Sequence, residues 1–461
     1  MLSIDFKPGE KLYEQIYERL KAAISDGYYQ SGDQLPSFRA YADHLGVSLN
    51  TVKTAYFQLL EEGYIISKER CGFFVDKIEL DHLGPREAVY PQYLAEAKEA
   101  SAWRYDFSPS AVDLEGLART GLQQAASLGM AQASRYQQAN PLGEVPLRNA
   151  LAHYLYEFRG LATSAENIVI TRGFSHNLLA LNQVFGHACY GLEDPGYALN
   201  LASLHANFEQ REKIPIDRYG FSVKDLEQTP ANIAVVSPNH QFPTGQVMGV
   251  RRRQRLLNWA SERPDRYIIE DDYDSVFKYA GRQIPAMKAI DRDDRVILSG
   301  SFSKSIGPFM GLAYMVLPDA LLDTYATCAD LGLTPSIASQ LTLSQWMAEG
   351  AFTKHVNRMN TYYRKKQGLI IDALQELPGL SFTQADTGLY LVFRLDPDCY
   401  NLNQLTQTWQ TEGLKIDSVA SYCRQKNWPW ADYLLGLGGV PLADLPQAME
   451  VLRRSLEGSR L

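Results

Sequence analysis

The first 75 residues alternate between apolar stripes of helical spacing and short polar loops. Over residues 10–24 the apolar positions recur every four residues, which predicts an amphipathic helix that ends by Gly27. A second helix is predicted after a cap at Ser37, and a third after a cap at Ser48. The alternating stretch that follows predicts a two-stranded ribbon with its tip at residues 68–72. This order of elements is the plan of a winged helix-turn-helix.

From about residue 105 the pattern changes to short apolar runs separated by stretches of helical periodicity. The runs that predict buried strands are residues 167–170, 232–237, 267–271, 295–300 and 312–317. This alternation is typical of an α/β domain with a mostly parallel sheet, and the residues from about 350 to 461 predict a smaller α+β lobe. We therefore expect a winged helix-turn-helix at residues 1–77, a linker at 78–104 and an α/β body at 105–461.

The composition narrows the class of protein. Hydrophobic residues make up 45% and charged residues 21% of the 461 positions, which excludes a disordered or fibrous protein. No stretch approaches the roughly 20 apolar residues that span a bilayer, and the N-terminus has no signal-peptide core. The five cysteines are scattered without a C-x-x-C pair, which favours a reducing compartment and excludes a cysteine-rich zinc module. We expect a cytoplasmic protein without a metal site.

A candidate reactive amine follows the predicted strand at residues 295–300. Lys304 stands in the sequence SFSK, after serines at positions 301 and 303. An amine at a strand end in an apolar pocket has a lowered pKa, so it can form a Schiff base with an aldehyde. The hydroxyls of Ser301 and Ser303 suit a phosphate. A solvent-exposed loop lysine is the alternative interpretation of this segment.

A candidate carboxylate, Asp271, ends the predicted strand at residues 267–271. A buried carboxylate at a strand end is costly unless a positive charge is paired with it. A protonated pyridine nitrogen would be such a partner, and Tyr273 could then hydrogen-bond the phenolic oxygen of the same ring. A solvated acidic loop or a metal site would also fit, although no histidine lies nearby in the sequence to support a metal.

Two further segments suit a phosphorylated aromatic ligand. Gly173, Phe174 and Ser175 begin a predicted helix, whose free N–H groups and dipole favour an anion. Tyr197 ends another apolar strand and could stack on an aromatic ring. Taken singly, both signals are weak, because many strand–glycine–helix joints bind nothing and an ordinary core tyrosine fits position 197 equally well.

In combination these segments resemble the fold-type I aminotransferases that use pyridoxal 5′-phosphate, over a match from about residue 106 to the C-terminus. With the winged helix in front, the chain is similar to MocR-type regulators of the GntR family. The motifs that carry the resemblance are LPSFR at 35–39, LGVSLNTVKTAYFQLLEEGYI at 45–65, CGFFV at 71–75, YQQANPLGEVPLR at 136–148, SPNHQFPTG at 237–245 and SFSK at 301–304.

The resemblance implies a cofactor, a partner and an assembly. The implied cofactor is pyridoxal 5′-phosphate, and the implied roles are Lys304 for the Schiff base, Asp271 for the pyridinium, Tyr273 for the ring oxygen and Tyr197 for stacking. Similar regulators are head-to-tail homodimers that bind a double-stranded DNA operator. Their aminotransferase-like domain senses a small-molecule effector.

The departures from the family pattern bear on activity. The arginine that usually follows the Schiff-base lysine by seven residues is Gly311 here, and the arginine that binds an amino-acid carboxylate is Leu434. An arginine–carboxylate pair is bidentate and charge-assisted, so its loss removes the main anchor of an amino-acid substrate. The aminotransferase-like domain is therefore expected to sense and not to act as an enzyme. His176, Ser301 and Ser303 are candidates to compensate in the phosphate site.

The charge of the N-terminal part does not by itself indicate a nucleic acid. The whole chain has a formal net charge of −8, and residues 1–80 carry nine Lys and Arg against twelve Asp and Glu. Position matters more than the sum, because the expected cations fall on the second and third helices and in the wing. The candidate DNA-binding residues are Arg39, Ser48, Asn50, Thr51, Lys53, Lys68, Arg70 and Gly72. Leu49 replaces an arginine usual in the family, and a leucine can still pack on a thymine methyl group.

The sequence thus predicts a DNA-binding transcriptional regulator whose aminotransferase-like domain binds pyridoxal 5′-phosphate and senses a B6 vitamer or an amine or amino-acid effector. Because the carboxylate arginine is absent, we favour a B6 vitamer or an amine without a carboxylate. Two alternatives stay open. One is an active aminotransferase with a fused DNA-binding domain, and the other is a DNA-binding protein whose large domain is a cofactor-free dimerisation scaffold.

Overall fold

The structure, a computed structural model, describes residues 1–69, 71–77, 103–113, 119–197, 210–279, 281–328, 334–384, 387–424 and 428–461. The chain divides into two compact units, Met1–Ala100 and Ser101–Leu461, and each is described by itself. The predicted linker at residues 78–104 lies outside the described residues except for its last two positions.

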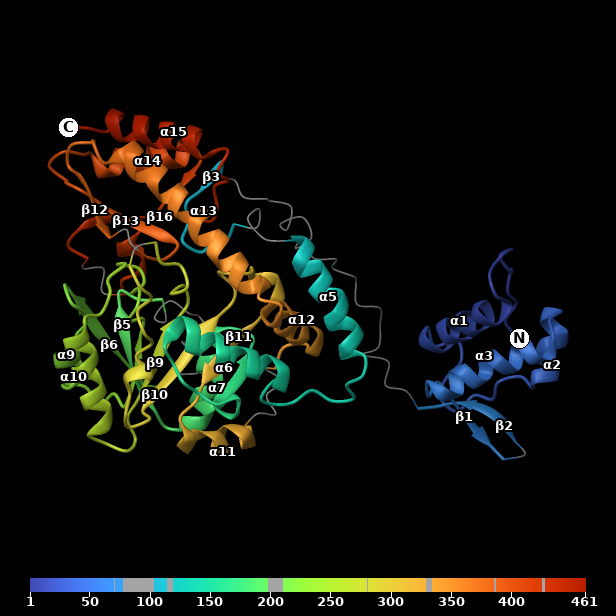
Figure 1. Ribbon diagram of the computed structural model, residues 1–461. Helices are drawn as coiled ribbons and strands as arrows, with labels where there is room; N and C mark the ends of the chain where they lie inside the picture. Colours follow the sequence, from blue (N-terminus) through green and yellow to red (C-terminus); the bar gives the residue numbers. More distant parts are fainter. Residues whose placement is uncertain are drawn as a thin grey trace. The chain divides into compact units, whose positions relative to one another are not determined.

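The described residues of the first unit, 1–69 and 71–77, form three helices and a hairpin (Figure 1). Its elements are α1 (Leu12–Ser25), α2 (Phe38–Leu45), α3 (Leu49–Glu61), β1 (Ile65–Lys68) and β2 (Gly72–Val75). Serine hydroxyls cap two helices, because Ser37 accepts the N–H of Ala40 and Ser48 accepts that of Thr51. The buried core is formed by Ile16, Leu20, Tyr41, Val52, Tyr56, Leu59 and Ile65. The predicted winged helix-turn-helix is confirmed.

An eight-stranded sheet forms the centre of the second unit, in the order β4-β11-β10-β9-β8-β5-β6-β7. Its strands are β4 (Ile168–Thr171), β5 (Cys189–Asp194), β6 (Gln210–Asp217), β7 (Gly220–Phe221), β8 (Ile233–Val236), β9 (Tyr267–Asp272), β10 (Val296–Ser301) and β11 (Ala313–Val316). Strands β11 and β7 run against the others. The prediction of a mostly parallel sheet is confirmed, and all five predicted strands are present.

Helices cover both faces of this sheet (Figure 1). They are α5 (Arg119–Ala133), α6 (Val145–Arg159), α7 (Phe174–Phe185), α9 (Val223–Leu226), α10 (Val250–Ser261), α11 (Asp319–Cys328) and α12 (Ile337–Ala348). Side chains alternate along each strand, so Ile269 joins the core that contains Leu181 of α7, whereas Ile268 joins the core that contains Trp259 of α10. The same alternation continues to the strand ends, where the functional side chains lie.

The smaller lobe contains a four-stranded sheet in the order β12-β13-β16-β15. Its elements are α13 (Ala351–Leu374), β12 (Leu380–Gln384), β13 (Tyr390–Leu395), α14 (Leu402–Thr411), β14 (Leu414–Lys415), β15 (Asp417–Ser418), β16 (Ala431–Gly436) and α15 (Leu445–Gly458). The predicted α+β character of this part of the chain is confirmed.

The start of the second unit is bound to the smaller lobe. Strand β3 (Tyr105–Asp106) pairs in parallel with β14, and the carbonyl of Phe107 accepts the N–H of Gly436 at 2.7 Å. Lys366 of α13 donates to the carboxylate of Asp113 at 3.0 Å, and these side chains are 1% and 3% exposed. The sequence analysis did not predict this attachment, since it assigned only the residues from about 350 onward to the smaller lobe.

We predict that Lys366→Met destabilises the second unit by about 3–5 kcal/mol, because it leaves the buried Asp113 carboxylate without its cation. Urea denaturation followed by tryptophan fluorescence measures this change, since all six tryptophans lie between positions 103 and 430. Lys365→Met, at the exposed neighbouring position of α13, is the control. Equal stability of the two variants would contradict the prediction.

Candidate functional site

Three consecutive carboxyl side chains end strand β9. Glu270, Asp271 and Asp272 are 0%, 8% and 7% exposed. A buried carboxylate is costly unless hydrogen-bond donors or cations are paired with it. Because side chains alternate along a strand, Glu270 and Asp272 lie on one face of the sheet and Asp271 lies on the other.

Protein groups satisfy the two carboxylates that share a face. Asp272 accepts the Nε–H of Arg159 at 2.8 Å, and neither side chain is more than 2% exposed. Glu270 accepts the backbone N–H groups of Met287 at 2.8 Å and Lys288 at 3.0 Å. These bonds fix the end of β9 and leave Asp271 as the carboxyl group that still needs a partner.

Asp271 has no comparable contact. Within the described residues, no hydrogen-bond donor reaches its carboxylate. Burial, together with the nearby carboxyl groups of Glu193 and Asp272, raises the pKa of Asp271 well above its ordinary value. Burial also raises the pKa of Glu193, on β5, to about 7. A cation bound next to Asp271 would lower its pKa again and favour the ionised carboxylate.

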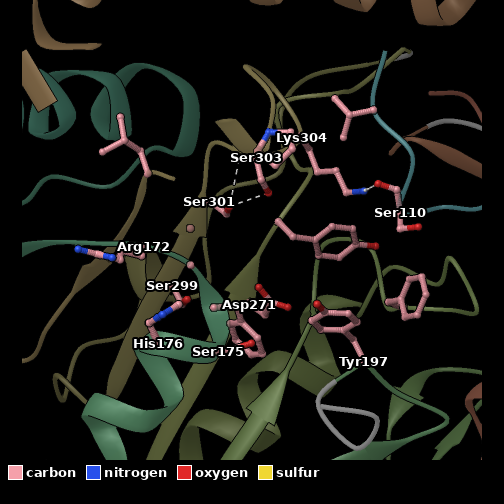
Figure 2. A pocket seen from close by; sticks show the side chains of 18 of the residues that line it. Ser110, Arg172, Ser175, His176, Tyr197, Asp271, Ser299, Ser301, Ser303 and Lys304 are labelled. Atoms are coloured by element: carbon pink, nitrogen blue, oxygen red, sulfur yellow. Dashed lines mark hydrogen bonds between the residues drawn. The ribbon is translucent and has the colours of Figure 1, made fainter. Parts of the chain in front are cut away.

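Asp271 lies in the wall of a cavity of about 460 Å³ (Figure 2). This volume falls within the range of small-molecule sites, roughly 300–1,000 Å³. The cavity is at the carboxyl ends of the parallel strands, where ligands of α/β proteins bind. All ten cofactor residues proposed from the sequence line it: Gly173, Phe174, Ser175, His176, Tyr197, Asp271, Tyr273, Ser301, Ser303 and Lys304.

The amine of Lys304 contacts the segment at the start of the second unit. Its Nζ donates to the carbonyls of Pro109 at 2.8 Å and Ser110 at 2.9 Å, and Figure 2 shows the side chain reaching toward Ser110. Burial lowers the pKa of Lys304 to about 8, although the negative charge of Asp274 opposes the shift. At pH 7 roughly a tenth of this amine is therefore in the neutral, nucleophilic form, far more than for an ordinary lysine.

Tyr273 and Tyr197 differ from the sequence prediction in their contacts and in their position relative to the strands. The hydroxyl of Tyr273 donates to the carbonyl of His240 at 2.8 Å, so it already has a hydrogen-bond partner within the protein. Tyr197 does not end a strand, because β5 stops at Asp194 and the following Pro195 cannot extend a strand ladder. The ring of Tyr197 still lines the cavity from the segment after β5, and it is 45% exposed.

Several of the groups that line the cavity are hydrogen-bond donors. Helix α7 begins at Phe174 without a side-chain cap, so its first N–H groups are available to an anion. The hydroxyls of Ser301 and Ser303 lie 2.9 Å apart in the same wall. Gly311 has a φ of +57°, and no heavy atom lies within 4 Å of the position where a side chain would begin.

Arg172 also lines the cavity, and the sequence analysis missed it. It directly precedes Gly173, and its Nη2 donates to the carbonyl of Thr334 at 3.4 Å. A cation immediately before a strand–glycine–helix joint is the sequence signal that could have found it. The position usually occupied by the carboxylate-binding arginine is Leu434, which is fully buried in an apolar cluster with Phe242 and Tyr390.

The candidate DNA surface is the exposed start of α3. Ser48 and Thr51 are bonded to each other, with 2.7 Å between their hydroxyl oxygens, and they form the helix cap. Leu49 and Asn50 are exposed at the first turn. Lys53 lies one turn further along α3, with its Nζ 5.9 Å from the ring centre of Phe38. The cap is thus structural, and the first-turn side chains are accessible to DNA bases.

The other candidates on this unit lie on α2 and in the wing. Arg39 is exposed near the start of α2, and Lys68 ends β1 with its Nζ 4.4 Å from the ring centre of Phe74. Gly72 begins β2 with a φ of +107°, a conformation that favours glycine. Arg70 lies outside the described residues.

The part of the chain that the structure describes contains neither a candidate membrane span nor a candidate metal cluster. No helix there is long and apolar enough to cross a membrane. No group of three or more potential metal-ligating side chains occurs there either.

Comparison with known proteins identifies the class of both units. Residues 12–75 match the bacterial regulatory proteins of the gntR family, and residues 119–425 match aminotransferase class I and II. The chain therefore belongs to the MocR-type regulators of the GntR family, in which a winged helix-turn-helix precedes an aminotransferase-like domain. The resemblance found in the sequence is confirmed.

Individual relatives agree with this class. The HTH-type transcriptional regulator YdeL of Bacillus subtilis is 35% identical over 451 residues, 96% of this chain and 96% of that protein. The HTH-type pyridoxine biosynthesis transcriptional regulator PdxR of Corynebacterium glutamicum is 30% identical, with 88% of each chain covered. A crystal structure of Pyrococcus horikoshii kynurenine aminotransferase, 20% identical, has a TM-score of 0.68 over 82% of this chain and 98% of its own.

These findings establish a transcriptional regulator with a gntR-type winged helix-turn-helix and an aminotransferase-like domain. The likeness to the solved aminotransferases shows the fold alone, and this fold is that of a family that binds pyridoxal 5′-phosphate.

We predict that Lys304 reacts with a small aldehyde at half its maximal rate near pH 8, because burial favours the neutral amine. The reaction is measured across pH by borohydride trapping and peptide mass spectrometry, with exposed Lys365 as the internal reference. The neutral amine predominates above pH 8, so reactivity should rise through that pH and then level off. A half-point near the ordinary lysine value of 10.5 would contradict the prediction.

Proposed function

We propose that this regulator binds pyridoxal 5′-phosphate at Lys304, and that the state of this site controls the affinity of the winged helix-turn-helix for its operator. The observation that carries the proposal is Asp271, a buried carboxylate that lines the cavity without a donor among the described residues. A pyridinium N–H would supply both the charge and the hydrogen bond that this carboxylate lacks.

Other lining residues fit the remaining parts of the cofactor. The N-terminus of α7 and the hydroxyls of Ser301 and Ser303 offer donors to a phosphate, and Tyr197 offers a ring face. When bound, pyridoxal 5′-phosphate supplies an aldehyde carbon and an electron-withdrawing ring for chemistry at a primary amine. The lowered pKa of Lys304 keeps that amine nucleophilic near neutral pH.

The site supports sensing better than turnover. Leu434 stands where the family has its carboxylate-binding arginine, and its surroundings are apolar. Gly311 stands where a phosphate-binding arginine is usual, so the cofactor has one strong contact fewer. We therefore infer that the domain senses a B6 vitamer, an amine or an amino acid, and that it is not an aminotransferase in use. The proposed assembly is a head-to-tail homodimer on double-stranded DNA.

The hydrogen bonds of Lys304 connect the cavity to the segment that follows the linker. Its Nζ donates to Pro109 and Ser110, within residues 103–113, and this segment follows the linker at 78–104. A lysine nitrogen bonded to a carbonyl carbon keeps at most one hydrogen, so it cannot donate to both carbonyls. Occupation of the site therefore changes the contacts of this segment. The change is allosteric if the two states differ in DNA affinity.

We predict that Asp271→Asn weakens binding of pyridoxal 5′-phosphate roughly ten- to a hundredfold, since a charged hydrogen bond contributes about 1.5–3 kcal/mol. Tryptophan quenching during titration of the full-length protein gives the Kd. Lys304→Ala should abolish the visible absorption band, and Glu376→Gln, at an exposed position, is the control. An unchanged Kd in Asp271→Asn would refute the role of Asp271.

We predict that Lys53→Ala weakens DNA binding about equally on specific and random DNA and reduces the salt slope of binding by about 1, as expected for a phosphate contact. Fluorescence anisotropy at several salt concentrations measures both quantities, with a DNA fragment selected by the protein from a random library. Lys77→Ala is the control, because Lys77 lies beyond the end of the hairpin that is opposite to the wing tip. A loss confined to the selected sequence would instead indicate a base contact.

A further inference from the structure

Three aromatic side chains form one wall of the cavity. Tyr197, Phe242 and Tyr422 all line it, and Phe242 stands between the two tyrosines. The ring of Phe242 is edge-on to Tyr422 at 4.7 Å and 85°, and edge-on to Tyr197 at 6.0 Å and 89°. We call these three residues the aromatic wall. Aromatic rings prefer such edge-to-face contacts, so an aromatic ring of a ligand could pack against these residues in the same way.

The aromatic wall has an apolar backing. Behind Phe242 lie the buried side chains of Leu434, Val392 and Val419, which belong to the same cluster. Tyr422 is held by its hydroxyl, which donates to Asp417 at 2.8 Å. This wall therefore presents carbon surface to the cavity, and a carboxylate placed against it would lose water without gaining a cation.

Among the described residues, the basic side chains that line the cavity are not in this wall. They are the cationic side chains of Arg172 and Lys304 and the imidazole of His176. Arg172 and His176 flank Gly173 at the N-terminus of α7, the end that suits a phosphate. Lys304 is the reactive amine itself. The lining residues thus provide an anion site at the N-terminus of α7 and an aromatic wall, with Lys304 and Asp271 in the same cavity.

We propose that the effector is an arylalkylamine: a primary amine that carries an aromatic ring and no carboxylate. This rests on the proposed function, since the amine is expected to react at the carbonyl carbon of the bound cofactor. The ring packs on Phe242 and Tyr422 of the aromatic wall, because Tyr197 is assigned to the cofactor ring, and the nitrogen takes the place of the Lys304 nitrogen. In the described residues Leu434 lies among apolar side chains, and this surrounding disfavours the carboxylate of the corresponding amino acid.

The exchange balances without any further reactant. The carbon–nitrogen double bond to Lys304 breaks, and an equivalent bond to the effector nitrogen forms. Two protons from the incoming ammonium group move to the Lys304 nitrogen, one before and one after the new carbon–nitrogen bond forms, and no electrons are gained or lost. The released Lys304 amine can then donate to Pro109 and Ser110, which are the contacts that this structure shows. The effector would thereby restore the attachment of residues 103–113.

The test is a titration of the full-length protein loaded with pyridoxal 5′-phosphate. The probes are 2-phenylethylamine, L-phenylalanine and ethanolamine, which separate the ring from the carboxylate. The readouts are the visible absorption spectrum and the affinity for a DNA fragment that the protein selects from a random library. We expect 2-phenylethylamine to change both readouts at a concentration at least tenfold below that of either other probe. An equal or tighter response to L-phenylalanine or ethanolamine overturns the proposal.

Substitutions in and behind the aromatic wall test which residues contact the effector. Tyr422→Leu should raise the half-saturating concentration of 2-phenylethylamine at least fivefold and leave that of ethanolamine unchanged. Tyr219→Leu, at a 55% exposed tyrosine that does not line the cavity, is the matched control. Leu434→Arg, with Leu434→Met as its control for folding, should shift the preference toward L-phenylalanine. A 2-phenylethylamine response that is unaffected by Tyr422→Leu overturns the assignment of the aromatic wall.

The experiment distinguishes failure of the proposed cofactor site from failure of the proposed effector class. If loading produces no visible band in the wild-type protein, the proposed cofactor site is wrong and the effector assignment falls with it. If the band forms and L-phenylalanine is preferred, the cofactor site stands and the arylalkylamine does not.

Discussion

The burial of three successive carboxyl groups at the end of β9 is the constraint on which the site depends. Strand alternation sends Glu270 and Asp272 to one face, where Arg159 and backbone N–H groups satisfy them. Asp271 is sent to the other face, and its burial without a donor among the described residues raises its pKa. The fold can hold this carboxyl group protonated, or it can hold it ionised beside a cation. A ligand that brings a cation therefore gains binding free energy from the protein's own electrostatics.

The same sheet places the amine near the carboxylate. Ser299 of β10 is the register partner of Asp271 on β9, and the chain reaches Lys304 five residues later, just beyond the strand end. Lys304 is thus confined to the carboxyl edge of the sheet, where burial lowers its pKa to about 8. Lys304 donates to the carbonyls of Pro109 and Ser110, so its amine is held by the segment at the start of the second unit and not by Asp271.

Much of this could be predicted from the sequence, because strand ends carry a local signal. Lys304, Asp271 and Gly173 each follow a short apolar run, and parallel strands bring such ends to one edge. Other features have no local signal. The attachment of residues 103–113 to the smaller lobe depends on a pairing with β14, some 300 positions away. The proline that stops β5 at Asp194 was visible in the sequence, yet its effect on Tyr197 was overlooked.

The aromatic wall could not be predicted from the sequence pattern of hydrophobic and polar residues. Its three rings come from positions 197, 242 and 422, on segments that have no shared periodicity, so only the packing of the two lobes reveals them as one surface.

The leucine at position 434 does more than remove the usual arginine, because it also contributes to the apolar cluster behind the aromatic wall. An empty place for a missing cation would leave a polar, hydrated gap, whereas Leu434 is fully buried among apolar side chains that back this wall. The side chain at position 434 is therefore part of a hydrocarbon cluster. Under the proposed function, this surface selects amine ligands by their hydrocarbon part, which is the selection expected of the proposed sensor.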